Sequence, residues 1–131
     1  MADIVLALKP TWLELILSGK KTAEFRRVLP QKLEPGDKVY LYCKKHIHGV
    51  AHVAAVKHVF DFEDKRNFIQ LYSELGCLTH DDIWIYWTGA QYPGVILLNS
   101  VTRYDDPHPW RGSVPQNFIY YHEKVQTRSN P

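Results

Sequence analysis

Residues 19–26 read Gly19-Lys20-Lys21-Thr22-Ala23-Glu24-Phe25-Arg26, and this stretch decides how the rest of the chain is interpreted. Before it, apolar residues repeat at helical spacing from Pro10 onward. Gly19 fits the position just past a helix end, because glycine adopts the left-handed conformation easily. After it, side chains alternate as in a strand over residues 22–28. The sequence therefore predicts a helix, a tight turn and a strand in direct succession.

This turn and strand carry a set of charged side chains. Glu24 and Arg26 are two residues apart on the expected strand, so both project from one face while Phe25 projects from the other. Lys21 is out of phase and can join them only from the turn. An ammonium, a guanidinium fork and a carboxylate together suit a nucleobase with its phosphate. The simpler alternative is an ion pair on an exposed strand, with the lysines as solvated charges.

The remaining apolar pattern predicts a small sheet. A continuous apolar run at residues 4–8 indicates a buried strand, and a hairpin turn is expected near residues 47–49. Residues 102–117 are rich in proline and are expected to form a loop that leads to a short segment at 118–121. Further strands are expected at residues 38–44, 50–60 and 94–101.

Two helices are expected between the middle strands and the last long one. The first covers residues 61–75, and the second starts at a capping box formed by Thr79 and Asp82. The second helix is expected to bury Ile83, Tyr86 and Trp87 on one stripe. This order is not a regular alternation of strands and helices. It favours an α+β fold, a mixed β-barrel of five or six strands with helices inserted after strand 1 and before the last long strand.

Length and composition limit the class of protein. A chain of 131 residues with 45% hydrophobic content suits one domain. No apolar run approaches the length of a membrane span, so we expect a soluble, cytoplasmic protein without a membrane partner. Cys43 and Cys77 lack the spacing of a zinc knuckle or a disulfide framework. His46, His48 and His52 share strand parity, but no carboxylate or cysteine follows at ligand spacing, so no metal or other cofactor is expected.

Charge and aromatic residues point toward nucleic acid locally. The net charge of +2 is small, but residues 20–27 carry four positive charges and one negative charge, which would attract phosphates. Bases stack on flat side chains, and each candidate here can instead be a core residue. Tyr42 is favoured because its parity differs from that of its apolar neighbours. The stacking candidates are Tyr42, Trp87, Tyr92 and Trp110.

The pattern Gly19-x-Lys21-x-x-Glu24-x-Arg26 resembles the signature motif of the ASCH domain family, which is related to PUA-like RNA-binding barrels. Lys9-Pro10, Pro35-Gly36-Asp37 and the stretch from Pro115 to Tyr120 also look like that family. The resemblance implies a PUA-like domain at residues 1–123, followed by a flexible tail at 124–131. It implies a cleft that binds RNA, a nucleotide or a modified nucleoside. The expected ligand-binding residues are Lys9, Lys21, Glu24, Arg26, Tyr42 and Trp87.

An enzymatic alternative follows from the same resemblance. Some small ASCH proteins remove the acetyl group of N4-acetylcytidine with a lysine, a threonine three residues later and a distant glutamate. Lys21 and Glu74 resemble the lysine and the glutamate, but Glu24 occupies the threonine position and Thr22 is displaced by two residues. A water-based amidohydrolase would use these four residues, with Glu24 or Glu74 as the general base. Glu74 can equally be a solvated helix end.

Two further hypotheses are weaker. Cleavage of RNA, reported for a family relative, would require His46 or His48 to lie near Lys21. A protein-interaction adaptor with a vestigial cleft would not need the intact Lys21, Glu24 and Arg26. The binding module is therefore the leading interpretation and the amidohydrolase its main alternative.

Overall fold

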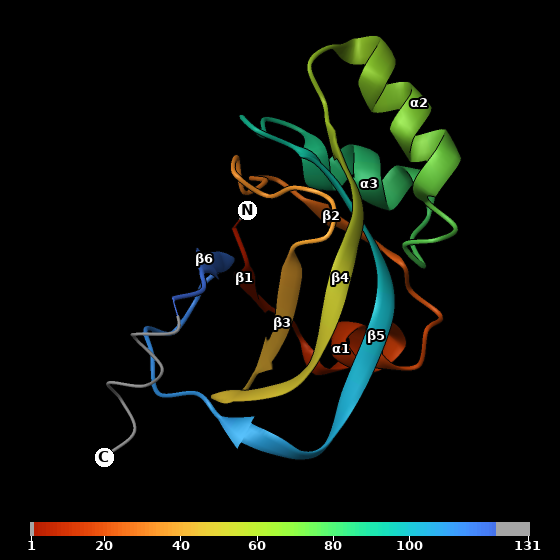
Figure 1. Cartoon of the computed structure of the whole chain (residues 1–131). Coiled ribbons are helices and arrows are strands. Elements are labelled where there is room, and N and C mark those ends of the chain that lie inside the picture. The colour runs from red at the N-terminus through yellow and green to blue at the C-terminus, as the bar shows by residue number, and fades with distance from the viewer. Residues whose placement is uncertain (1, 123–131) are drawn as a thin grey trace.

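The computed structural model describes residues 2–122, which form one six-stranded sheet and three helices (Figure 1). The expected tail at 124–131 lies outside these residues. The strands are β1 (Ile4–Ala7), β2 (Ala23–Arg26), β3 (Lys38–Cys43), β4 (His46–His58), β5 (Gly94–Pro109) and β6 (Phe118–Tyr120). The helices are α1 (Pro10–Leu17), α2 (Phe62–Tyr72) and α3 (His80–Trp87).

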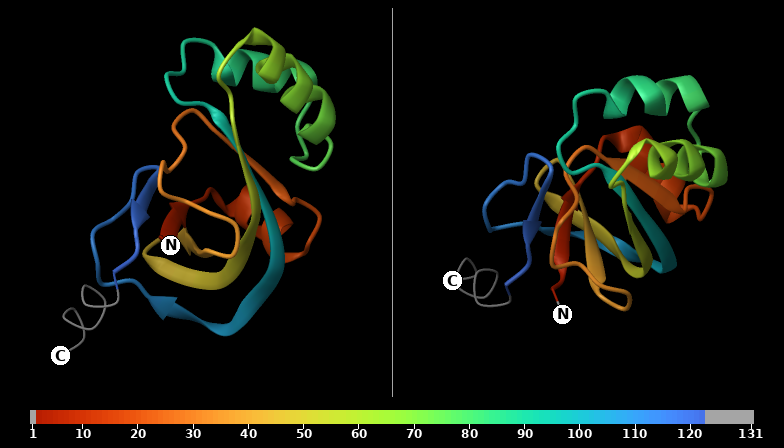
Figure 2. Two further views of the ribbon diagram at one scale, coloured as in Figure 1. Left: turned by 45° about the horizontal axis from the view of Figure 1, so that its top comes forward. Right: turned by 90° about the horizontal axis from the view of Figure 1, so that it is seen from above.

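The sheet is mixed and strongly curled. Its strand order is β2-β5-β4-β3-β1-β6, in which β1 and β3 are parallel and every other neighbouring pair is antiparallel. Figure 2 shows that the long, bent β4 and β5 wrap the sheet into a half-barrel, with α2 and α3 together at one end. The predicted α+β class, the mixed barrel and both helix insertions are confirmed.

Two hydrophobic clusters hold these layers together. The larger one joins alternate residues of β1 and β3 to the buried face of α1, represented by Leu6, Leu41 and Ile16. The smaller one packs α2 and α3 onto β2 and β5 through residues such as Ile69 and Ile83. Burial of Ala23 and Phe25 on one face of β2 therefore fixes the strand, while Glu24 and Arg26 of the charged motif lie on its other face.

The predicted hairpin turn at residues 47–49 is wrong, because these residues lie within β4. The turn is formed instead by Lys44 and Lys45, which both adopt positive φ angles of 51° and 65° between the paired residues Cys43 and His46. Two-residue hairpins need such angles, but usually use asparagine or glycine. Gly49 is needed for another reason: a Cβ at this position would collide with the carbonyl oxygen of Thr102 on β5.

The last long strand is also longer than expected. Residues 102–109, predicted as loop, continue β5 as far as Pro109. Only the first part of β5, residues 94–97, pairs with β2, so the later part is paired with β4 alone. A proline is tolerated there because the unpaired side of a strand needs no N–H donor.

Side chains close the barrel where the sheet ends. The edge strands β2 and β6 are not neighbours in the sheet order. Arg26 crosses this gap from β2 and donates to Asn117 Oδ1 at 2.7 Å and to the Ala7 carbonyl oxygen at 2.8 Å. Asn117 in turn donates through Nδ2 to the Val28 carbonyl oxygen at 3.2 Å. We call this set of contacts the seam.

Candidate functional site

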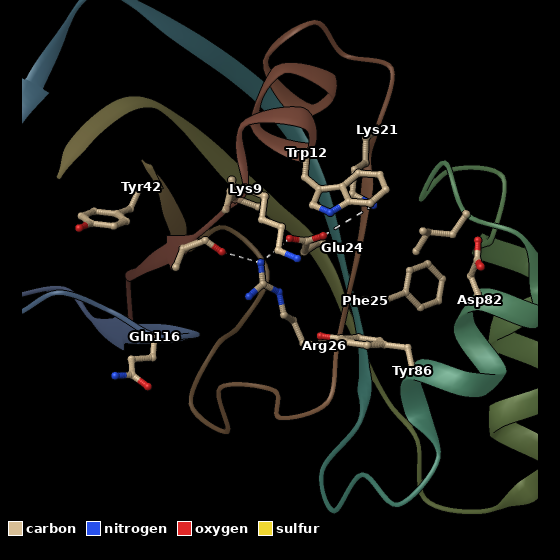
Figure 3. Close-up of a pocket in the computed structure, with 13 residues that line it drawn as sticks. Lys9, Trp12, Lys21, Glu24, Phe25, Arg26, Tyr42, Asp82, Tyr86 and Gln116 are labelled. Atoms are coloured by element: carbon tan, nitrogen blue, oxygen red, sulfur yellow. Dashed lines mark hydrogen bonds and ion pairs between the residues drawn. The ribbon is translucent and has the colours of Figure 1, made fainter. Parts of the chain in front are cut away.

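A cavity of about 510 Å³ opens beside the seam (Figure 3). It lies where β1 and β3 end, since Ala7 and Tyr42 are paired neighbours on these parallel strands and both line it. Other lining residues come from α1, β2, α3 and the segment before β6. The polar and aromatic lining residues are Lys9, Trp12, Lys21, Glu24, Phe25, Arg26, Tyr42, Asp82, Tyr86 and Gln116.

Glu24 is the centre of a charged network on the cavity wall. Its Oε1 lies 3.6 Å from Lys21 Nζ, and its Oε2 accepts from Arg26 Nη2 at 2.6 Å. Glu24 is only 5% exposed and Lys21 only 2%. The network is therefore not the solvated surface pair of the simpler alternative. We call Lys21, Glu24 and Arg26 the floor of the cavity.

Lys21 reaches the floor from the turn that precedes β2. Its ammonium donates to the carbonyl oxygen of Gly76 and lies 4.8 Å from the ring centroid of Trp12. Burial lowers the pKa of Lys21, and the nearby Glu24 carboxylate opposes this shift. The ammonium is thus desolvated but paired, which makes its protonation sensitive to what enters the cavity.

Two aromatic side chains flank the floor. Figure 3 shows Trp12 of α1 on one side of Glu24 and Tyr86 of α3 on the other. Tyr86 is 40% exposed, so the prediction that it belongs to the buried stripe of α3 is wrong. Ile83 and Trp87 occupy that stripe. Trp12 and Tyr86 offer flat surfaces in the position where a planar ligand would stack.

The aromatic residues favoured by the sequence lie elsewhere or contribute differently. Trp87 is 2% exposed, packs on Phe25 with ring centroids 5.3 Å apart and donates to the Arg26 carbonyl oxygen at 3.1 Å. It therefore supports the floor from within the core and does not line the cavity. Tyr42 does line it, but Figure 3 shows its hydroxyl directed away from Glu24. Trp110 is buried beside Tyr42 in a separate cluster.

The sequence matches the ASCH domain family over residues 6–122. The chain belongs to this family. No curated protein matches the sequence. A crystal structure of an ASCH protein from Zymomonas mobilis is similar, with a TM-score of 0.79 and 21% identity over 97% of this chain and 92% of that one. A point variant of that protein gives the same TM-score at 20% identity, over 96% and 94% of the two chains. This likeness shows a shared α+β fold.

Two residues of the expected catalytic set lie outside the cavity of this ASCH domain. Thr22 does not line the cavity, and backbone hydrogen bonds join Thr22 to Leu75 and Leu98. Glu74 is exposed in the turn after α2 and does not line it either. The geometry therefore brings Lys21 and Glu24 together and leaves Thr22 and Glu74 apart from them.

The contacts of His46 and His48 lie at the hairpin and do not include a floor residue. His46 and His48 contact the backbone carbonyls of Lys44 and Cys43 at the hairpin, and neither lines the cavity. Within residues 2–122, no three side chains of the metal-binding types are grouped as a cation site. Over the same residues, no helix has the length and apolar character needed to cross a membrane.

Proposed function

We propose that this ASCH domain binds a nucleobase of RNA, of a nucleotide or of a modified nucleoside in the cavity. The observation that carries the proposal is the buried Glu24 carboxylate, held between Lys21 and Arg26 and flanked by the rings of Trp12 and Tyr86. A volume of about 510 Å³ is typical of sites for single small ligands. One base with its sugar fits this class of site, whereas a duplex does not.

Each part of the site has a role toward a base. The carboxylate of Glu24 accepts hydrogen bonds, which matches the exocyclic amine of cytosine, adenine or guanine. Lys21 and Arg26 are donors that suit a carbonyl oxygen. Trp12 and Tyr86 contact the faces of the ring, and stacking of this kind contributes about 1 to 3 kcal/mol per base. Polar recognition at the edge and apolar contact at the faces would together select a planar heterocycle.

A second function, hydrolysis of an N4-acyl cytidine or a similar amide, is supported by one observation. Burial lowers the pKa of Lys21 while Lys21 lies beside Glu24, a combination common in acid–base sites. Glu24 would take a proton from the attacking water while Lys21 polarises the amide carbonyl, and Glu24 would then return that proton to the amine nitrogen as the C–N bond breaks. Thr22 and Glu74 have no part in this version, because they do not line the cavity.

Binding is tested by titrating labelled single-stranded RNA and free nucleosides into the protein and into Lys21→Met and Glu24→Gln. We expect both variants to weaken binding at least about tenfold, since each removes a charge-assisted hydrogen bond. Lys20→Met is the matched control, because Lys20 is exposed and does not line the cavity. Equal loss in all three variants would place binding outside the cavity and refute the proposal.

The enzymatic alternative has a separate readout. Incubation with N4-acetylcytidine is followed by the absorbance change that accompanies conversion to cytidine. Turnover that Lys21→Met abolishes and Lys20→Met leaves intact would establish an amidohydrolase. Binding without turnover, at high enzyme concentration and long times, would reject it and leave the binding module.

A further inference from the structure

The charged residues that line the cavity differ in how many partners they have. Lys21 is paired with Glu24 and with the Gly76 carbonyl, and Arg26 with Glu24, Ala7 and Asn117. Asp82 accepts from the Thr79 backbone N–H at 3.3 Å as part of the capping box of α3. The donors of the floor are thus largely used within the protein.

Lys9 is the exception among these cations. It lines the cavity and is exposed, and within residues 2–122 its side chain has no hydrogen-bond or ion-pair partner. Figure 3 shows it extended toward Arg26 and Glu24 from the segment that joins β1 to α1. Three cationic side chains, Lys9, Lys21 and Arg26, therefore line the cavity together with two carboxylates, Glu24 and Asp82. Lys21 and Arg26 are paired with Glu24, so the cavity wall carries a net positive charge and Lys9 is its unpaired cation.

A second polar side chain without a partner lies in the same region. Gln116 lines the cavity, is exposed, and makes no side-chain hydrogen bond within the described part of the chain. It directly precedes Asn117, whose side-chain oxygen accepts from Arg26 in the seam. An amide can both donate and accept, which suits ester and hydroxyl oxygens. We call Lys9, Tyr86 and Gln116 the rim of the cavity.

We propose that the ligand of this cavity carries a phosphate group, and that Lys9 is the residue that contacts it. The ligand class is then a nucleotide, either free or within a strand, and not an uncharged nucleoside. This inference rests on the function proposed above. A phosphate beside Lys9 would supply the negative charge that this cation lacks within the protein. The base would then occupy the floor between Trp12 and Tyr86.

The experiment compares nucleosides with their 5′-monophosphates by calorimetry, for the four common ribonucleosides and for N4-acetylcytidine. We expect the phosphate to tighten binding at least about tenfold, as one charge-assisted hydrogen bond does. Lys9→Gln should remove this gain, so that the nucleoside and its monophosphate bind the variant with equal affinity. Lys9 is the N-cap residue of α1 but its side chain makes no cap hydrogen bond, so the substitution leaves the helix intact. Lys20→Gln is the matched control.

The outcomes separate this inference from the proposed function. If nucleosides and monophosphates bind equally, or if Lys9→Gln keeps the phosphate gain, the inference is wrong and base binding stands. If neither class binds, the proposed function fails and the inference fails with it. A dinucleotide with an internal phosphodiester forms the second arm. Tighter binding than the monophosphate identifies a strand as the source of the phosphate, and equal binding identifies a free nucleotide.

Discussion

The floor and the rim of the cavity lie side by side but differ in the burial and the pairing of their side chains. The floor residues are buried, or nearly so, and paired with one another and with backbone carbonyls. Lys9 and Gln116 of the rim are exposed and have no side-chain partner within residues 2–122. The floor therefore serves the fold as well as the ligand, whereas the rim is free to serve the ligand alone. Substitutions in the two regions should separate stability from binding.

The largest effect is expected for Arg26→Ala. This change leaves Glu24 without its closest partner and leaves the Ala7 carbonyl and the Asn117 side chain without a donor. Breaking a buried ion pair from one side costs about 3 to 5 kcal/mol of unfolding free energy. Urea unfolding followed by circular dichroism measures this cost.

Arg27→Ala is the control for that measurement. Arg27 is exposed and donates to the carbonyl oxygens of Tyr86 and Thr88 at 2.8 and 3.1 Å. Its loss should cost about 1 kcal/mol or less, because the freed carbonyls can bond to water. Similar costs for the two variants would show that the seam does not stabilise the barrel.

A smaller effect, on binding only, is expected for Tyr86→Ala. Loss of one stacking surface should weaken nucleotide binding by about 1 to 3 kcal/mol, while the exposed side chain contributes little to the core. Ile85→Ala is the control on the same helix, since Ile85 is exposed and does not line the cavity. Fluorescence anisotropy with a labelled oligonucleotide reports affinity, and the thermal midpoint reports stability. A fall in midpoint without a fall in affinity would assign Tyr86 to the fold.

The smallest change in stability is expected for Lys21→Met. Burial is the main cause of the lowered pKa of Lys21, so the folded protein bears a desolvation cost that methionine lacks. At neutral pH this relief should offset the lost contacts with Glu24 and the Gly76 carbonyl, so the variant should be as stable as the parent protein, or slightly more so. The unfolded chain holds the Lys21 proton up to a higher pH than the folded one, so the parent gains stability as pH rises toward 10.5.

Chemical unfolding at several pH values tests whether the parent protein gains stability relative to Lys21→Met as the pH rises. The advantage of Lys21→Met over the parent should shrink between neutral pH and pH 10.5, because methionine does not titrate. An advantage that grows with pH would mean that the ammonium form is favoured by folding. The variant should in either case bind ligand more weakly.

Strands and helices that are marked by a local sequence pattern could be predicted from the sequence. Strand parity correctly placed Glu24 and Arg26 on one face, and the turn after Gly19 brings Lys21 to them as expected. The hairpin at Lys44 and Lys45 could not be found, because neither residue type signals a positive φ.

The aromatic walls were harder to predict than the charged floor. In the sequence, Trp12 belongs to the apolar pattern that predicts the helix from Pro10 onward, and that pattern does not distinguish a cavity wall from the core. A usable signal existed in α3, where the eight residues include Trp84, Tyr86 and Trp87. Successive helical residues point about 100° apart, so one buried stripe cannot hold all three rings. The role of Asn117 had no local signal, because its partner Arg26 lies 91 residues earlier in the sequence.

The 91 residues between Arg26 and Asn117 affect when the seam can form during synthesis of the chain. Arg26 leaves the ribosome early, but the barrel cannot be closed around it until Asn117 has also emerged. Until then Arg26 lacks one of its acceptors, and the cavity lacks the wall that includes Gln116. Competence to bind ligand should therefore appear only after β6 has docked on β1 and Gln116 has taken its place in the wall.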